Sequence, residues 1–270
     1  MTGASGFLGR YVVERLAHQP GNKLFIYGRH NDVASDPFRN IHKRTLDFFD
    51  SEAIRAISDE VDTLVHLAWA GIPNYDDPIH LVQVPYHLNL IKRFVNLGAN
   101  KVFISGTCFE YGSVEGEISE EHELNPTNKY ATAKNQLRIL AEELSTDLRF
   151  NLTWGRLFYL YGKGQPIHSL FGSLLKAANS GKSSYRIAYP DLCLDYSSAS
   201  DMARYIDCLI RSEEPIGVVN LGSGNPRTLG LLAQSWIREL KLSIDLELGY
   251  EECKSQSFWA DVSKLQRFVD

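Results

Sequence analysis

Tyr130 and Lys134 have the spacing in this 270-residue chain that most directly suggests chemistry. They stand four residues apart in the segment Y-A-T-A-K, which follows N-P-T-N. In a helix this spacing puts both side chains on one face, one turn apart. An ammonium near a phenol favours the phenolate, so we expect Lys134 to lower the pKa of Tyr130 toward neutrality. Tyr130 would then protonate a carbonyl oxygen during reduction or accept a proton from an alcohol during oxidation.

Thr107 is the third candidate for the catalytic set. It follows the strand-like run Lys101–Ser105, at the end of a parallel strand where ligands of open sheets bind. Its hydroxyl would hold the substrate oxygen near Tyr130. A threonine at this place could instead stabilise a turn. The predicted catalytic residues are therefore Thr107, Tyr130 and Lys134.

A glycine turn stands at the start of the chain, in T-G-A-S-G-F-L-G from Thr2 to Gly9. Glycine lets the chain turn tightly, lets backbone approach a pyrophosphate and lets a helix pack closely on a sheet. Apolar residues at helical spacing follow in Arg10–His18, so the turn opens onto a helix whose first N–H groups can bind phosphate. This pattern predicts a dinucleotide site.

The elements that position these residues alternate between strand-like and helical patterns. This alternation predicts an α/β fold with a Rossmann-type doubly wound parallel sheet. We expect a dinucleotide-binding domain over residues 1–160 and a smaller substrate-binding lobe over 161–270, with some later elements returning to the sheet. The predicted strands are Lys23–Tyr27, Thr63–Ala68, Lys101–Ser105, Asn151–Leu157 and Gly217–Leu221, and the predicted helices are Arg10–His18, Ser51–Ile57, Val82–Leu97, Lys129–Ser145 and Leu229–Glu239.

The first strand of this sheet is expected to be truncated, because only Met1 and Thr2 precede Gly3, the first glycine of the turn. A buried strand usually takes about 5 residues. Neighbouring strands would then keep unpaired backbone groups, which are costly when buried. We expect low stability from this chain relative to an N-terminally extended one.

Composition limits the classes of partner. The chain is 44% hydrophobic with a formal net charge of −5, which argues against nucleic acid and anionic membranes. The histidines are dispersed, so no metal site is expected. The cysteines form no C-x-x-C pair, which favours reduced thiols and a cytoplasmic location. They are Cys108, Cys193, Cys208 and Cys253.

Several motifs together carry a resemblance that covers nearly the whole chain. The chain resembles the extended short-chain dehydrogenases/reductases, which include the nucleotide-sugar epimerases, dehydratases and reductases. The motifs are the glycine turn, H-L-A at His66–Ala68, S-G-T-C-F-E-Y-G at Ser105–Gly112, Y-A-T-A-K, G-R-L-F-Y-L-Y-G at Gly155–Gly162, N-L-G-S-G at Asn220–Gly224 and F-W-A-D-V-S-K-L at Phe258–Leu265.

The resemblance implies roles for individual residues. Tyr130 would be the acid/base, Thr107 its hydroxyl partner, and Lys134 would bind the nicotinamide ribose. Asp47 would lie by the adenine, although it could instead cap the helix that begins at Ser51. The implied cofactor-binding residues are Gly3, Ser5, Gly6, Phe7, Gly9, Arg29, Asp47, Phe48, Leu67, Ala68, Ser105, Lys134 and Phe158.

The choice of dinucleotide is indicated by the end of the second strand, F-I-Y-G-R-H. An NAD enzyme commonly places a carboxylate there to bind the ribose 2′-hydroxyl, but this chain has Gly28 followed by Arg29. An arginine pairs well with a 2′-phosphate, and Arg10 could add charge. We therefore prefer NADP(H), with NAD(H) possible; a solvated surface role for Arg29 is the alternative.

The residues after Thr107 bear on the reaction. The family's dehydratases resemble one another in having Asp–Glu there, but this chain has Cys108 and Phe109, and Glu110 is one residue late. We expect Glu110 to point elsewhere and Cys108 to be a buried thiol rather than a nucleophile. The resemblance then favours a reductase of a nucleotide-linked 4-keto-6-deoxy sugar, serving surface-polysaccharide synthesis.

Four departures from the family pattern leave the substrate open, so a smaller keto substrate is an alternative. Leu194 stands where the family often has an arginine, and Glu251 and Glu252 stand near the place of a second one. Tyr159 and Gln83 each stand where the family usually has an asparagine. Basic residues that could compensate are Lys163, Arg186, Arg227 and Lys254. The family also suggests a homodimer through the helices at Val82–Leu97 and Lys129–Ser145.

Two other functions stay open. The first is a nucleotide-sugar 4-epimerase with tightly bound NAD, which would use the same three catalytic residues. The second is a dinucleotide-binding sensor or scaffold without catalysis, favoured by the missing strand and arginines.

Overall fold

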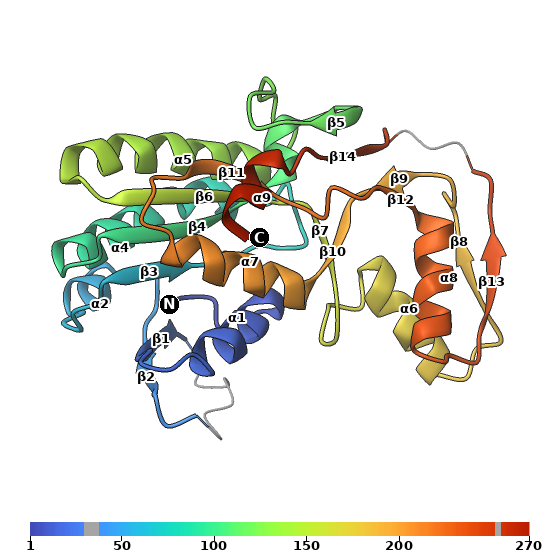
Figure 1. Cartoon of the computed structure of the whole chain (residues 1–270), viewed down its shortest axis with the longest axis horizontal. Helices are drawn as coiled ribbons and strands as arrows, with labels where there is room; N and C mark the ends of the chain where they lie inside the picture. Colours follow the sequence, from blue (N-terminus) through green and yellow to red (C-terminus); the bar gives the residue numbers. More distant parts are fainter. Residues whose placement is uncertain (30–37, 252–254, 270) are drawn as a thin grey trace.

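A parallel sheet forms the centre of the protein (Figure 1). The computed structural model describes residues 1–29, 38–251 and 255–269. Two groups of parallel strands are joined by Thr2, which bridges Tyr27 on one side and His66 on the other. The α/β doubly wound fold is thereby confirmed. From edge to edge the order is β2 (Ile41–Thr45), β1 (Leu24–Gly28), Thr2, β3 (Thr63–His66), β4 (Lys101–Thr107), β6 (Asn151–Leu157) and β11 (Gly217–Leu221).

Met1 and Thr2 lie where the sheet needs a strand between β1 and β3. Thr2 N donates to the Val65 carbonyl at 3.0 Å, and the Tyr27 amide donates to the Met1 carbonyl at 2.9 Å. These are the alternating bonds of parallel pairing. Beyond them, at the amino edge of the sheet, lies a groove of about 950 Å³ whose lining includes Met1, Leu24 and Val65.

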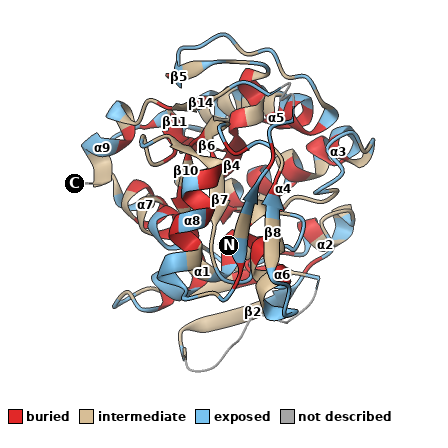
Figure 2. Ribbon diagram, turned by 90° about the vertical axis from the view of Figure 1, so that its right-hand side faces the viewer, coloured by how far each residue is buried: buried red, intermediate tan, exposed pale blue. Residues whose placement is uncertain are grey.

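Helices cover both faces of the sheet (Figures 1 and 2). On one face α1 (Phe7–Ala17), α7 (Ala199–Arg211) and α9 (Ser263–Val269) share a core with Ile26, Phe103 and Val219. On the other face, Leu64, Ile104 and Trp154 lie in a second core with α2 (Ser51–Arg55), α4 (Val84–Asn96) and α5 (Lys129–Leu148). Burial on both faces explains why these strands are nearly continuous apolar runs.

The later part of the chain divides between this sheet and a separate lobe. α7, β11 and α9 lie with the sheet, whereas the lobe has a third core that includes Phe171 and Trp236 (Figure 1). Its elements are α6 (Leu170–Asn179), β8 (Ser184–Ile187), α8 (Leu229–Glu239) and β13 (Asp245–Leu248). Two smaller sheets hold the remaining strands. β7 (Tyr159–Tyr161) pairs with β10 (Tyr196–Ser198), and the other sheet has the order β12 (Arg227–Thr228), β9 (Cys193–Leu194), β14 (Phe258–Ala260) and β5 (Gly116–Ile118).

Some element boundaries differ from the predictions. The predicted helix Val82–Leu97 is two helices, α3 (Ile79–Val82) and α4, because Gln83 ends one and caps the next, with Pro85 in the first turn of α4. Strand β2, I-H-K-R-T, was not predicted, since an edge strand next to solvent lacks the apolar run used as the signal. In the described part of the chain, no helix is long and apolar enough to cross a membrane.

Candidate active site

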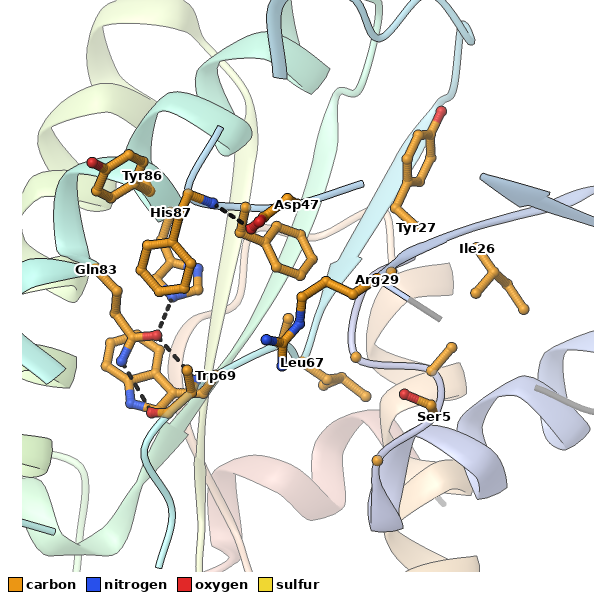
Figure 3. A pocket seen from close by; sticks show the side chains of 18 residues that line it. Ser5, Ile26, Tyr27, Arg29, Asp47, Leu67, Trp69, Gln83, Tyr86 and His87 are labelled. Carbon is orange, nitrogen blue, oxygen red and sulfur yellow. Dashed lines mark hydrogen bonds between the residues drawn. The ribbon is translucent and has the colours of Figure 1, made fainter. Parts of the chain in front are cut away.

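A cavity of about 230 Å³ opens where Thr2, β1 and β3 end, at the carboxyl edge of the sheet (Figure 3). The strand order reverses here, because the chain first runs outward through β1 and β2 and then continues on the other side of Thr2. Open parallel sheets bind ligands at such a point. The predicted cofactor residues that line the cavity are Gly3, Ser5, Gly6, Arg29, Asp47, Phe48, Leu67 and Ala68.

The glycine turn forms one wall, and its close packing requires glycine. Gly3 has a φ of +74°, and a Cβ added there would lie 2.6 Å from the Ala68 amide nitrogen. A Cβ on Gly9 would lie 2.0 Å from the Gly3 carbonyl oxygen. Gly6 is the N-cap of α1, and no side chain caps the N–H groups of the first turn. These N–H groups at the positive end of the helix fit the pyrophosphate of a dinucleotide.

Five predicted cofactor residues lie outside the cavity lining. Phe7 packs edge-on against Tyr11 at a centroid distance of 5.8 Å, and Phe158 is buried against Phe258 at 5.8 Å. Ser105 takes part through its carbonyl oxygen, which accepts a hydrogen bond from Lys134 Nζ at 2.7 Å. The proposed cofactor contacts of Phe7, Gly9, Ser105, Lys134 and Phe158 stay predictions.

Arg29 and Asp47 line the cavity near the carboxyl end of β1. The Arg29 side chain reaches toward the middle of the pocket in Figure 3 and is exposed. Asp47 accepts a hydrogen bond from the Phe49 amide at 3.0 Å, whereas Asp50 caps α2. The alternative that Asp47 caps this helix is therefore wrong. Arg10 does not line the cavity, and its Nε donates to the Ser5 carbonyl.

The lining residues that were not among the predicted site residues include Trp69, Gln83, Tyr86 and His87. The sequence does hold a signal for three of them. Trp69 follows H-L-A beyond the carboxyl end of β3, where ligands bind, and Gln83 and His87 stand four apart at the start of a helix.

A buried chain of hydrogen bonds, here called the neutral network, joins Thr2, His66, His87 and Gln83. His66 contacts the Thr2 hydroxyl at 2.7 Å and His87 Nδ1 at 2.8 Å, and His87 Nε2 lies 3.1 Å from Gln83 Oε1. Since Gln83 Oε1 only accepts, His87 Nε2 donates to it, and His66 Nε2 therefore donates to His87 Nδ1. The Thr2 hydroxyl then donates to His66 Nδ1. Each ring nitrogen of the two histidines thus makes one hydrogen bond, and both imidazoles are neutral.

The electrostatics of the two histidines agree with this pattern. Burial lowers the pKa of His66 to about 3, and the nearby Lys134 adds to the effect. The pKa of His87 lies well below its usual value for the same reason, with a further contribution from His66. Gln83 also holds both backbone groups of Ala70, accepting from its amide at 3.0 Å and donating to its carbonyl at 3.1 Å.

Tyr130 and Lys134 share the inner face of α5, as their spacing predicts, and both are buried. Lys134 Nζ lies 5.9 Å from the Tyr130 ring centroid and 4.0 Å from that of Trp69. Burial lowers the pKa of Lys134 to about 7, and the Glu110 carboxylate opposes this change.

The expectation that Lys134 brings the pKa of Tyr130 toward neutrality is wrong for this arrangement. Burial raises the pKa of Tyr130 above its usual value, and the hydrogen bond with the Thr107 side chain only partly offsets that rise. The ammonium faces Trp69 and the Ser105 carbonyl instead. Desolvation therefore dominates, and Tyr130 is a protonated phenol, the form that donates a proton.

Thr107 ends β4 and begins the short helix η1 (Cys108–Tyr111). Its hydroxyl accepts from the Phe109 amide at 3.3 Å, while its own amide donates to Glu110 Oε1 at 2.9 Å. This is a capping box, so Thr107 has the turn-stabilising role and also contacts Tyr130. The turn-stabilising role is thus observed, and the role of the hydroxyl toward a substrate oxygen stays a prediction.

Glu110 points into the core, as expected from its position one residue late. It is fully buried, pairs with Arg156 Nε at 2.9 Å and accepts from Trp154 Nε1 at 3.1 Å. Arg156 also donates to the Tyr111 hydroxyl at 3.0 Å. Burial raises the pKa of Glu110, and Arg156 together with the N–H donors opposes that rise. We call Glu110, Arg156, Trp154 and Tyr111 the charged network.

Cys108 is buried beside Thr107, and burial raises the pKa of its thiol above the usual value. It is therefore a poor nucleophile, in line with the buried thiol expected. Cys193 and Cys208 are also free thiols, and Cys253 lies outside the described residues. Among the described residues, no cluster of three histidine, cysteine or acidic side chains could hold a metal ion.

Two further aromatic rings pack near the Tyr130 ring. Tyr75 lies 5.4 Å and Phe109 6.5 Å from its ring centroid, and Tyr159 lies 6.1 Å from Phe109. Of the basic residues considered for a substrate diphosphate, Arg186 pairs with Glu251 at 2.9 Å on the surface. Lys254 lies outside the described residues.

Comparison with known proteins agrees with this geometry. The profile of the "NAD dependent epimerase/dehydratase family" matches residues 1–222. The chain belongs to this family. It is 30% identical over 253 residues to the dTDP-6-deoxy-L-talose 4-dehydrogenase (NAD(+)) of Aggregatibacter actinomycetemcomitans, with 90% of this chain and 91% of that protein covered. The resemblance to the extended short-chain dehydrogenases/reductases is confirmed, and the chain is an NAD-dependent enzyme of the oxidoreductase type.

Two solved structures show the same fold at lower identity. The UDP-N-acetylglucosamine 4-epimerase of Methanobrevibacter ruminantium is 21% identical with a TM-score of 0.85, covering 100% of this chain and 90% of that one. The dTDP-glucose 4,6-dehydratase of Bacillus anthracis is 19% identical with a TM-score of 0.80, covering 99% and 88%. Members with this fold thus bear different activities, so the reaction must be argued from the site.

Proposed function

We propose that this enzyme is an NAD(P)H-dependent reductase of a nucleotide-linked 4-keto-6-deoxy sugar. The observation that carries the proposal is the protonated phenol of Tyr130, hydrogen-bonded by Thr107 next to the dinucleotide cavity. A buried acid at this place suits protonation of a carbonyl oxygen as it becomes an alcohol. The relative from Aggregatibacter actinomycetemcomitans is named as a 4-dehydrogenase of a 6-deoxy sugar nucleotide, which supports both substrate and reaction type.

Each residue has a defined task in this reaction. When bound, the reduced nicotinamide supplies a hydride to the carbonyl carbon of the substrate. Tyr130 gives its proton to the carbonyl oxygen, and the Thr107 hydroxyl holds that oxygen and the phenol in line. The ammonium form of Lys134, 5.9 Å from the Tyr130 ring centroid, would offset part of the negative charge left on the phenol oxygen when the proton leaves, although burial outweighs this effect on the pKa of Tyr130.

Elimination of water is disfavoured by the same residues. A dehydratase needs an acid and a base beside the reacting carbons, and the carboxylate nearest to Thr107 in sequence is committed to the charged network. Cys108 is buried and its raised pKa keeps the thiol protonated. Hydride transfer with proton donation needs neither group.

NADP(H) is the proposed cofactor, with NAD(H) as the alternative. Arg29 lines the cavity and its guanidinium would pair with a 2′-phosphate, while Gly28 stands where an NAD enzyme has a carboxylate. We expect Arg29→Ala to weaken NADPH binding at least about tenfold and NADH binding little, because one charge-assisted pair is lost. Titrating both cofactors into both proteins tests this, and an equal change for the two would reject the role.

The reaction is tested with Tyr130→Phe, which removes only the proton donor. We expect turnover of thymidine-, guanosine- or uridine-diphosphate 4-keto-6-deoxy sugars to fall by about 10²–10⁴-fold while cofactor binding is kept. The assay is NADPH or NADH oxidation, with Tyr189→Phe, an exposed tyrosine, as control. Full activity in Tyr130→Phe would remove Tyr130 from the mechanism.

The same screen separates the alternatives. Purified protein that carries NAD and interconverts sugar epimers without net oxidation would identify a 4-epimerase. Cofactor binding with no turnover of any keto-sugar nucleotide would identify a sensor or scaffold. Activity on keto sugars that lack a nucleotide would identify the smaller substrate.

Three broader expectations accompany this function. The lobe would bind the nucleotide sugar, and the enzyme would act in the cytoplasm in surface-polysaccharide synthesis. A homodimer through α3, α4 and α5 is supported by exposed apolar side chains on α3 and α5: Leu81, Val82 and Ile139.

A further inference from the structure

Trp69 stands between a buried ammonium and a buried imidazole. Lys134 Nζ lies 4.0 Å from the centroid of its ring, and the His87 ring stacks on it at 4.7 Å with an interplanar angle of 5°. The indole also meets the Tyr130 ring edge-on at 6.0 Å and forms part of the cavity wall (Figure 3). It is thus the one side chain among the described residues that contacts both rings and Lys134 and also lines the cavity.

Several contacts fix the orientation of this indole. Its Nε1 donates to His80 Nδ1 at 2.9 Å, and His80 Nε2 in turn contacts the Asn74 carbonyl at 2.8 Å. Gln83 holds the amide and carbonyl of the next residue, Ala70. The stacked His87 is held by the neutral network. The indole therefore cannot turn without losing its hydrogen bond to His80 and its stacking on His87.

The surroundings of Lys134 explain why this indole matters. Burial disfavours the ammonium, and Lys134 is 2% exposed. Its ammonium donates a hydrogen bond to the neutral Ser105 carbonyl at 2.7 Å, while the carboxylate that acts on it, Glu110, is paired with Arg156. Four other titratable groups of this region, His66 of β3, His87 of α4, Cys108 of η1 and Tyr130 of α5, are uncharged near neutral pH, because burial lowers the pKa values of the two histidines and raises those of the thiol and the phenol. His80 of α3 accepts the indole N–H.

We propose that Trp69 is a positioning residue for Lys134: its indole face stabilises the ammonium form and holds it behind the wall of the cofactor cavity. The negative face of the indole ring attracts a cation, and the attraction grows when both groups are desolvated. Trp69 thus supplies the electrostatic support that an unpaired carboxylate would otherwise give. That the Lys134 charge matters for turnover rests on the proposed function, whereas the stabilisation of this charge by Trp69 is independent of it.

The test measures the protonation of Lys134 without turnover. Protein labelled with ¹³C at the lysine ε carbons is titrated by NMR from pH 5 to 10, and Lys134→Met assigns the resonance. Because Lys134 has a lowered pKa near 7, its titration stands apart from those of ordinary lysines. We expect Trp69→Leu to lower the midpoint of the Lys134 titration by about one pH unit. Trp69→Phe should lower it by less than half of that, because a phenyl ring attracts a cation less strongly than an indole but more strongly than a leucine side chain.

The controls separate the indole's charge effect from packing. Trp259→Leu, a tryptophan change in β14, is expected to leave the Lys134 midpoint unchanged. An unchanged or raised midpoint in Trp69→Leu would overturn the proposal, since it would mean that the indole only excludes water. Failure of the proposed reduction is a separate result, because it would appear as lack of turnover in wild-type protein whose Lys134 still titrates as described.

Discussion

The reactive pair stands between two buried hydrogen-bond networks that differ in charge. The neutral network reaches from Thr2 through two histidines to Gln83 and holds the wall that carries Trp69. The charged network pairs Glu110 with Arg156 beneath Thr107. One network thereby positions the surroundings of Lys134, and the other positions the partner of Tyr130.

This difference teaches how each network can fail. A buried ion pair depends on both partners, because the survivor of a deletion is a desolvated charge. A network of neutral histidines has no such charge. In acid, however, its histidines bind protons in the unfolded chain but not in the folded one, which stabilises the unfolded state. The charged network should therefore be sensitive to mutation and the neutral network to pH.

The largest effect is expected from Arg156→Met. Glu110 would stay fully buried without its cation, so the free energy of unfolding should fall by about 3–5 kcal/mol. Arg55→Met is the matched control, because its partner Glu52 is exposed and such pairs contribute about 0–1 kcal/mol. Urea unfolding measures both. Equal decreases in the free energy of unfolding of the two variants would show that the buried pair contributes no more to stability than the exposed one.

A smaller effect is expected from pH. Below pH 6.5 the unfolded chain protonates His66 and His87, whereas the folded chain keeps them neutral because burial lowers both pKa values, that of His66 to about 3. The stability contribution is present above pH 6.5 and is lost as the pH falls toward 3. Between pH 6.5 and 5.5 the loss should be about 2 kcal/mol for the two histidines together.

Urea unfolding at each pH, with His87→Gln and His168→Gln compared, checks this assignment. His87→Gln should remove about half of the loss, and His168→Gln, at an exposed position, should leave it unchanged. A slope that is the same in all three proteins would place the acid sensitivity elsewhere.

The smallest effect is expected from Gln83→Met. This change leaves the backbone groups of Ala70 and the His87 N–H without their partner, which should lower the free energy of unfolding by about 1–2 kcal/mol. Cofactor binding should weaken as well, because Ala70 and His87 line the cavity. Urea unfolding and a cofactor titration measure the two effects. Unchanged values for both would mean that the neutral network does not support the cavity wall.

The sequence predicted the fold and part of the site well. Strands Asn151–Leu157 and Gly217–Leu221 and helix Leu229–Glu239 have the predicted bounds, because buried apolar runs and helical periodicity are local signals. Trp69, Gln83 and His87 were missed as site residues. Their positions carry a weak local signal, but their roles depend on pairings between separate elements, such as His66 with His87, which only the folded chain brings together.

What the sequence determined by itself is the set of local devices: glycines that permit a tight turn before α1, a four-residue spacing that places Tyr130 and Lys134 on one helix face, and the family to which they belong. Only the tertiary structure decided their electrostatics. The spacing predicted a phenol made acidic by its neighbour, yet Tyr130 is desolvated and Lys134 faces Trp69. The physical reason is that a pKa depends on everything packed around a group, and distant segments do that packing.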